Sequence, residues 1–156
     1  AALGRSMLVC FGSLMLGVVG GTDRLDTTVI SDAVNLAARI ESLTRTYGVS
    51  LLITEHTYAE LPAGDELAGC IRKVDRVVVK GKSKAVDVYE VFAADEPELC
   101  RHKRATLADF HAAYEAFHGG ELASARTAFQ QLLAQCPDDK VVAHYVERCR
   151  GGASEA

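Results

Sequence analysis

The chain has 156 residues, enough for one ordinary domain or for one small domain with an appendage. Its apolar fraction of 49% and charged fraction of 24% are typical of a globular protein and exclude a disordered chain. The net charge of −4 offers no basic field to nucleic acid or anionic lipid, so a nucleic-acid partner is excluded.

Cysteine usage and apolar patterning indicate a cytoplasmic setting. The five cysteines lack the spacing of a metal site, and we interpret them as reduced thiols. The apolar stretch 7–20 is too short and too rich in glycine to cross a bilayer, and it does not resemble a signal peptide. We therefore expect no membrane segment in this chain, although regions outside it could attach the protein to a membrane. The absence of an initial Met suggests a piece of a longer protein.

The first half of the chain predicts a strand, a loop and a helix in turn. Residues 7–11 and 14–19 are two short apolar runs that predict one buried strand, straight or bent, which ends at a glycine pair. The polar stretch 22–28 is typical of a loop. A helix then begins at Ser31, a good N-cap, and ends at Gly48. Its core stripe has helical spacing: Leu36, Ile40, Leu43 and Tyr47.

The next elements alternate between strand and helix. Residues 49–54 predict a strand, and 56–61 predict a short helix closed by Pro62. Residues 71–79 and 85–92 flank a Gly-Lys-Ser turn and predict an antiparallel hairpin, with the run Val77, Val78 and Val79 as the core of its first strand.

The composition changes near residue 95, and everything afterwards is helical. We therefore expect two parts, 1–95 and 96–156. Ala113, Ala125, Phe129 and Pro137 fall at spacings that resemble a single tetratricopeptide unit. Because such units need about three copies to bury a continuous core, this tail is expected to pack on the rest of the chain or to pair between subunits. Its histidines are too dispersed to form a metal site.

Chemistry concentrates in the segment 24–41. Asn35 and Arg39 lie at i and i+4, so they share one helix face beside the core stripe. An amide next to a guanidinium could hold a sugar and a phosphate, because the Arg donors form a rigid fork that stays charged. The alternative is an exposed helix face with a routine Arg–Glu contact.

The motif Val-Asn-Leu-Ala-Ala-Arg, preceded by Thr-Thr-Val-Ile-Ser-Asp, is similar to the helix motif of class III adenylate and guanylate cyclases. The similarity continues through Leu-Ile-Thr at 52–54, Val-Lys-Gly-Lys at 79–82 and Val-Tyr-Glu-Val at 88–91, in the family's order. It covers residues 12–92 and implies the C-terminal half of a cyclase catalytic domain. The implied fold is α/β, part of a ferredoxin-like α+β core, followed by a small all-α segment.

The resemblance implies a role for four residues. Asn35 would position the ribose, and Arg39 would stabilise charge on the α-phosphate. Lys80 would hold the terminal phosphates. Thr28 matches the base-reading position, where a threonine favours ATP over GTP. The implied reaction is conversion of ATP to 3′,5′-cyclic AMP and pyrophosphate, for cyclic-nucleotide signalling.

The resemblance also implies a metal and a partner. Mg²⁺ or Mn²⁺ would be held by aspartates that precede this chain, so we expect no metal ligands in it and interpret Asp26 and Asp32 as loop and cap residues. In the family, two protomers pair head to tail, so the partner would be a second protomer or the missing N-terminal half. The chain alone is expected to be inactive.

Departures from the family pattern leave alternatives. Residues 9–12 differ from the family's usual strand end, and Ser31 replaces a common glycine. The chain could instead be a non-catalytic cyclase-like module for dimerisation or regulation. A third possibility is an α/β ligand-binding domain unrelated to cyclases.

Overall fold

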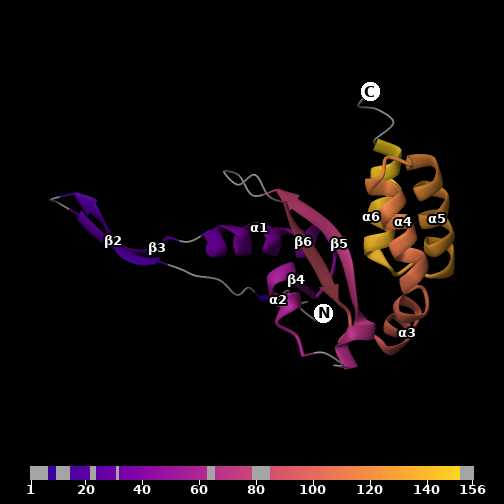
Figure 1. Ribbon diagram of the computed structural model, residues 1–156, viewed down its shortest axis with the longest axis horizontal. Helices are drawn as coiled ribbons and strands as arrows, with labels where there is room; N and C mark the ends of the chain where they lie inside the picture. The colour runs from indigo at the N-terminus through magenta and orange to yellow at the C-terminus, as the bar shows by residue number, and fades with distance from the viewer. Residues whose placement is uncertain are drawn as a thin grey trace.

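The computed structural model describes residues 7–9, 15–21, 24–30, 32–62, 66–78 and 85–151. Strands and helices are mixed as far as Val91, and only helices follow (Figure 1). The predicted succession of an α/β part and an all-α part is therefore confirmed. None of the helices in the described ranges is long and apolar enough to cross a membrane.

The main sheet has four strands in the order β1-β4-β6-β5. Their bounds are Met7–Val9 for β1, Leu51–Thr54 for β4, Ile71–Val78 for β5 and Ala85–Val91 for β6. β1 is parallel to β4, whereas β6 is antiparallel to both β4 and β5. The antiparallel β5–β6 hairpin confirms the prediction for 71–92. Between β4 and β5 lie the short helices α2 (Glu55–Ala59) and η1 (Glu66–Cys70).

Alternation along β6 gives the sheet one buried face. Val86, Val88 and Glu90 are buried, whereas the side chains between them are only half-buried. On β5 the register shifts between Lys73 and Asp75, as in a β-bulge. The predicted core run is only partly right, because Val77 is buried while Val78 is 57% exposed. Strand alternation sends neighbouring side chains to opposite faces, so consecutive valines cannot all reach the core.

Helix α1 (Asp32–Tyr47) follows the predicted stripe. Ile40 and Tyr47 are buried, and Leu36 and Leu43 pack against the same core. The helix ends at Gly48, whose φ of 62° is the left-handed conformation that glycine adopts without strain. The predicted N-cap Ser31 lies outside the described residues.

The prediction of a loop at 22–28 is wrong. Residues Arg24–Ile30 form strand β3, which pairs antiparallel with β2 (Met15–Gly21) in a separate two-stranded sheet. Four consecutive β-branched residues, 27–30, favour an extended backbone. The prediction of a loop rests on the polar composition of 22–28, which is dominated by the charged residues before this run. In Figure 1 the hairpin lies beyond the N-terminal end of α1, away from the four-stranded sheet.

Four helices complete the fold. They are α3 (Pro97–Ala105), α4 (Leu107–His118), α5 (Leu122–Gln135) and α6 (Lys140–Gly151). Helices α4 and α5 each turn an apolar stripe inward, where Phe110, Tyr114, Ala125, Phe129 and Leu132 are buried. These residues share one core cluster with Ile40, Val74 and Val88, so the helical segment docks on the α/β part.

A buried ionic cluster lies at this junction. Arg72 of β5 is 1% exposed, and its Nε donates to Glu90 of β6 over 2.6 Å. Its two terminal nitrogens donate to both carboxylate oxygens of Asp139, just before α6, over 2.8 Å each. Lys103 of α3 joins the cluster by donating to Glu90 and Asp95 over 2.6 Å each. The cluster therefore ties the sheet to α3 and to the start of α6.

Two tyrosines reinforce the junction. The Tyr145 hydroxyl of α6 donates to the carbonyl oxygen of Val74 over 2.7 Å, and the Tyr47 hydroxyl of α1 donates to Asp75 over 2.6 Å. Both bonds reach the bulged part of β5. The bulge therefore supplies polar anchors to helices from both parts of the chain.

Asp139→Ala should lower the free energy of unfolding by about 3–5 kcal/mol, because Arg72 would lose a bidentate partner while it stays buried. The variant also removes the acceptor for the Val142 amide. Urea denaturation measures the change. Asp138→Ala is the matched control, since its side chain is exposed one residue earlier. Equal losses for the two variants would contradict the role given to the ionic cluster.

Candidate functional site

Two of the predicted site residues lie one turn apart on α1. Arg39 is exposed, and it immediately precedes Ile40, which is fully buried. The buried stripe therefore holds the helix in place while the guanidinium of Arg39 projects from the surface. The Asn35 backbone lies in the same helix, and nothing of its side chain is described.

The routine Arg–Glu contact on α1 involves another arginine. Arg45 donates to the carboxylate of Glu41 over 2.9 Å, at the spacing i, i+4. Both side chains are partly or largely in solvent, so this pair contributes little to stability. Glu41 therefore has its partner in the last turn of the helix, toward the end farther from Asn35.

The other two predicted residues lie on either side of α1 in the sequence. Thr28 is a residue of β3, where it pairs with Gly17 of β2. The two-stranded hairpin thus carries Thr28 shortly before the chain enters α1. Lys80 lies outside the described residues, between the last paired residues of β5 and β6, Val78 and Ala85. Three of the four predicted residues therefore have a described backbone position, and Arg39 also has a described side chain.

No metal centre is formed within the described ranges, where no group of three or more His, Cys, Asp or Glu side chains could hold an ion. The described donor set therefore does not fit a divalent metal. Asp26 lies on β3 and Asp32 begins α1, and nothing of their side chains is described.

A cavity of about 400 Å³ opens between α2, the half-buried face of the sheet and α4. The rings of Tyr58 and Tyr89 stack in it at 4.5 Å, and the ammonium of Lys73 lies 6.0 Å from the Tyr89 ring. Lys73 also donates to Asp87 over 2.8 Å, and this bond raises its pKa. Burial, with Lys73 and Arg72 nearby, lowers the pKa of His111. The cavity thus combines aromatic walls with an already neutralised cation.

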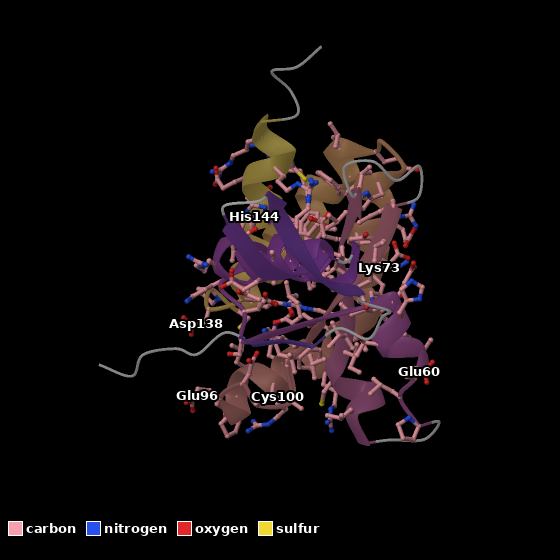
Figure 2. The ribbon with its side chains drawn as sticks, turned by 90° about the vertical axis from the view of Figure 1, so that its left-hand side faces the viewer. Glu60, Lys73, Glu96, Cys100, Asp138 and His144 are labelled. Atoms are coloured by element: carbon pink, nitrogen blue, oxygen red, sulfur yellow. The ribbon has the colours of Figure 1, made fainter. Side chains whose placement is uncertain are left out.

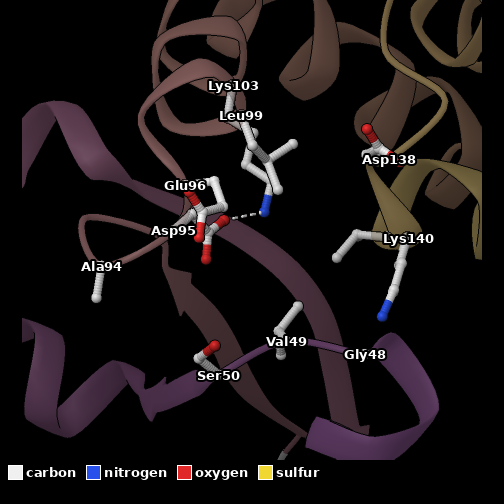
Figure 3. A pocket seen from close by; sticks show the side chains of 11 residues that line it. Gly48, Val49, Ser50, Ala94, Asp95, Glu96, Leu99, Lys103, Asp138 and Lys140 are labelled. Atoms are coloured by element: carbon white, nitrogen blue, oxygen red, sulfur yellow. Dashed lines mark hydrogen bonds and ion pairs between the residues drawn. The ribbon is translucent and has the colours of Figure 1, made fainter. Parts of the chain in front are cut away.

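A second cavity, of about 280 Å³, lies between the end of α1, the loop after β6, α3 and the start of α6 (Figure 3). Lys103 and Lys140 approach it from opposite sides, and the Lys103 ammonium is bound to Asp95. Arg39, whose side chain is the one described among the four predicted site residues, lines neither cavity. Sequence reasoning missed both cavities, because their linings come from elements far apart in the chain and follow no local pattern.

Comparison with known proteins gives consistent relatives. An adenylate cyclase of Anabaena cylindrica is 47% identical over 83 residues, which are 53% of this chain and 16% of that protein. A terminal-differentiation-specific adenylate cyclase of Dictyostelium discoideum is 34% identical over 139 residues, 88% of this chain and 6% of that protein. The structure of a bacterial light-regulated adenylyl cyclase aligns with a TM-score of 0.41 and 29% sequence identity. The alignment covers 62% of this chain and 27% of the cyclase chain. No family model matches.

The sequence similarity shows that this chain contains part of a class III nucleotidyl cyclase domain. Both of these relatives are named adenylate cyclases, and the chain spans only a small part of their length. The match with the Dictyostelium protein is too long to fit within residues 1–95, so it extends into the helical segment. The helices are therefore part of what this chain shares with that relative.

The helical segment should lose stability on mild acidification. Burial, with Arg148 nearby, lowers the pKa of His118 and of His144, which lies edge-on to Tyr47. A histidine whose pKa is lower in the folded than in the unfolded protein stabilises the fold in its neutral form. This stabilisation is fully present above the unfolded-state pKa of about 6.5, and it is lost as the pH falls through the folded-state pKa. The urea concentration at the unfolding midpoint should therefore decrease as the pH is lowered from about 7 to about 5.

His144→Gln should remove part of this pH dependence, because glutamine does not titrate in that range. His56→Gln, on α2, controls for replacing a histidine outside the helical segment. Urea midpoints across the pH series decide the matter. If the His144→Gln profile keeps the full wild-type slope, the contribution assigned to His144 is wrong.

Proposed function

We propose that this chain is the C-terminal part of an adenylate cyclase catalytic domain, which converts ATP to 3′,5′-cyclic AMP and pyrophosphate. The observation that carries the proposal is the placement of Arg39, which is exposed one turn after Asn35 on a helix whose adjacent face is buried. The similarity to adenylate cyclases supports it across this helix and the strands that follow.

Arg39 is proposed to stabilise the transition state. When the ribose 3′-hydroxyl attacks the α-phosphate, negative charge builds up on the oxygens of the five-coordinate phosphorus. A guanidinium stays protonated and presents a rigid fork of donors, so it binds these oxygens without reorganising. Ile40 and Tyr47 fix the helix, and the position of Arg39 is therefore set before the nucleotide binds.

Asn35 is proposed to orient the ribose. An amide both donates and accepts hydrogen bonds, which suits a sugar hydroxyl and ring oxygen. Orientation matters because the attacking hydroxyl must be in line with the leaving pyrophosphate. Thr28 is proposed to bond the adenine edge, and Lys80 to bind the terminal phosphates.

The remaining half of the site is proposed to come from elsewhere. A divalent ion, Mg²⁺ or Mn²⁺, would supply charge neutralisation at the phosphates. We assign its ligands to the N-terminal part of a cyclase domain, because the family's metal-binding aspartates precede the segment that this chain resembles. A second protomer, paired head to tail, or that N-terminal part is the proposed partner.

We also propose a cytoplasmic location and assign the helical segment, 96–156, to a separate unit resembling one tetratricopeptide repeat.

Arg39→Ala should reduce turnover by about 10²–10³-fold while ATP binding changes much less, because one preorganised donor to the transition state is lost. The variants are tested in a chimera, in which the matching part of this chain replaces the corresponding 83-residue segment of the Anabaena cylindrica cyclase. Cyclic AMP formation gives kcat and KM for each variant.

Arg45→Ala is the matched control on the same helix, since Arg45 is exposed and paired only with Glu41 among the contacts described. It should keep turnover near that of the unsubstituted chimera. The chain alone, with ATP and Mg²⁺ or Mn²⁺, should form no cyclic AMP above background. Turnover that survives Arg39→Ala would exclude the proposed role, and an inactive chimera would favour a non-catalytic module.

The same chimera tests base recognition by Thr28. Its hydroxyl can serve the adenine edge as donor or acceptor, so ATP should have a higher kcat/KM than GTP. Thr28→Ala should narrow the difference by lowering kcat/KM for ATP, and Thr27→Ala, next to it on β3, is the control. Equal efficiency for the two nucleotides before substitution would show that Thr28 does not select the base.

A further inference from the structure

Two cysteines distant in sequence meet where the α/β part joins the helical segment. Cys70 is the last residue of η1, and Cys100 lies in the first turn of α3. Their sulfur atoms are 4.0 Å apart, and both residues are free thiols. Cys70 is only 2% exposed, whereas Cys100 is half-buried. Figure 2 shows Cys100 on α3, next to the end of the sheet.

The backbone on each side is anchored. The Cys70 carbonyl accepts a hydrogen bond from the Phe92 amide over 2.9 Å, and the Cys100 amide donates to the Glu96 carbonyl over 2.9 Å. A disulfide needs its sulfurs about 2.05 Å apart, so closure requires an approach of about 2 Å. Rotation of two short side chains can provide a movement of this size without moving the anchored backbone.

A guanidinium lies against the pair. Arg104 follows Cys100 by one helical turn, and its Nη2 lies 2.7 Å from the Cys70 sulfur. A neighbouring arginine favours negative charge on a cysteine sulfur. Burial and the adjacent Cys70 sulfur raise the pKa of the Cys100 thiol, and Arg104 acts in the opposite direction. The cationic neighbour distinguishes this pair from inert buried thiols.

We propose that Cys70 and Cys100 form a dithiol that low-molecular-weight disulfides oxidise to an internal disulfide, stapling α3 to the start of β5. The half-exposed Cys100 thiolate attacks one sulfur of the small disulfide and releases one small thiolate. The Cys70 thiolate then attacks the Cys100 sulfur of this mixed disulfide and releases the second. The two protein thiols lose two protons and two electrons, and the small disulfide is reduced to two small thiols.

The order of the two attacks follows from exposure. A molecule the size of oxidised glutathione can reach Cys100, whereas Cys70 is enclosed by the fold. Arg104 contacts Cys70, so its charge assists the second, ring-closing attack. The staple joins the helical segment covalently to the sheet and does not depend on the proposed nucleotide chemistry.

The test uses the reduced chain with oxidised glutathione as the probe. Intact mass should show the loss of two hydrogen atoms without a lasting glutathione adduct, and peptide mapping should join Cys70 to Cys100. The closed form should melt roughly 5–10 °C higher than the reduced form, since the link constrains the unfolded chain. Addition of dithiothreitol should reverse both changes.

Variants separate the two steps. Cys70→Ser should stop the reaction at a glutathione adduct on Cys100, and Arg104→Gln should slow ring closure by about tenfold. Cys136→Ser, at another half-buried cysteine, should leave both steps unchanged.

A stable wild-type adduct, no reaction at either thiol, or a link to a different cysteine would overturn the proposal. If Cys70→Ser fails to fold, the wild-type mapping and melting shift still decide. The location of the link also shows whether Cys10, outside the described residues, takes part.

Discussion

The fold depends on one buried guanidinium. Arg72 lies inside the protein with its donors directed at Glu90 on the neighbouring strand and at Asp139 before α6. Its Cζ lies 4.3 Å from the centroid of the Phe110 ring, which adds a cation–π contact from α4. A buried charge is tolerated only when its partners are in place, so β5 can pack in this way only if the helical segment is docked.

This requirement links the helical segment to the proposed nucleotide chemistry. Tyr47, at the end of α1, bonds Asp75 on β5, and its ring lies edge-on to His144 of α6. The helix that carries Asn35 and Arg39 is therefore fixed at its C-terminal end by both the sheet and the last helix. A change in docking would be felt first at that end, which lies about two turns from Arg39.

The junction between the two parts contains three different interactions. The ionic cluster around Arg72 provides directional hydrogen bonds that orient the two parts, and the aromatic core around Tyr145 provides buried apolar area. The Cys70–Cys100 pair places two thiols close to each other. Lys103 and Arg104 are consecutive residues of α3, and they contact the ionic cluster and the thiol pair respectively. The short helix α3 thus holds the two systems together.

The sequence by itself determined the local features. The stripe of α1, its glycine end, the β5–β6 hairpin and the succession of α/β and all-α parts follow from short-range periodicity and turn chemistry. The ordered cyclase motifs also identified the family and proposed Asn35 and Arg39 as site residues. Strand β3 was missed because local charge outweighed its β-branched run.

Only the tertiary structure decided which distant groups meet. The Arg72–Asp139 pair spans 67 positions and the Cys70–Cys100 pair spans 30. Val77 and Val78, identical in sequence terms, lie on opposite sides of one strand. Periodicity reports which face of an element is buried, whereas the partner across the core depends on how the elements are packed. The buried charges and the thiol pair therefore became visible only when β5, α3 and α6 were brought together.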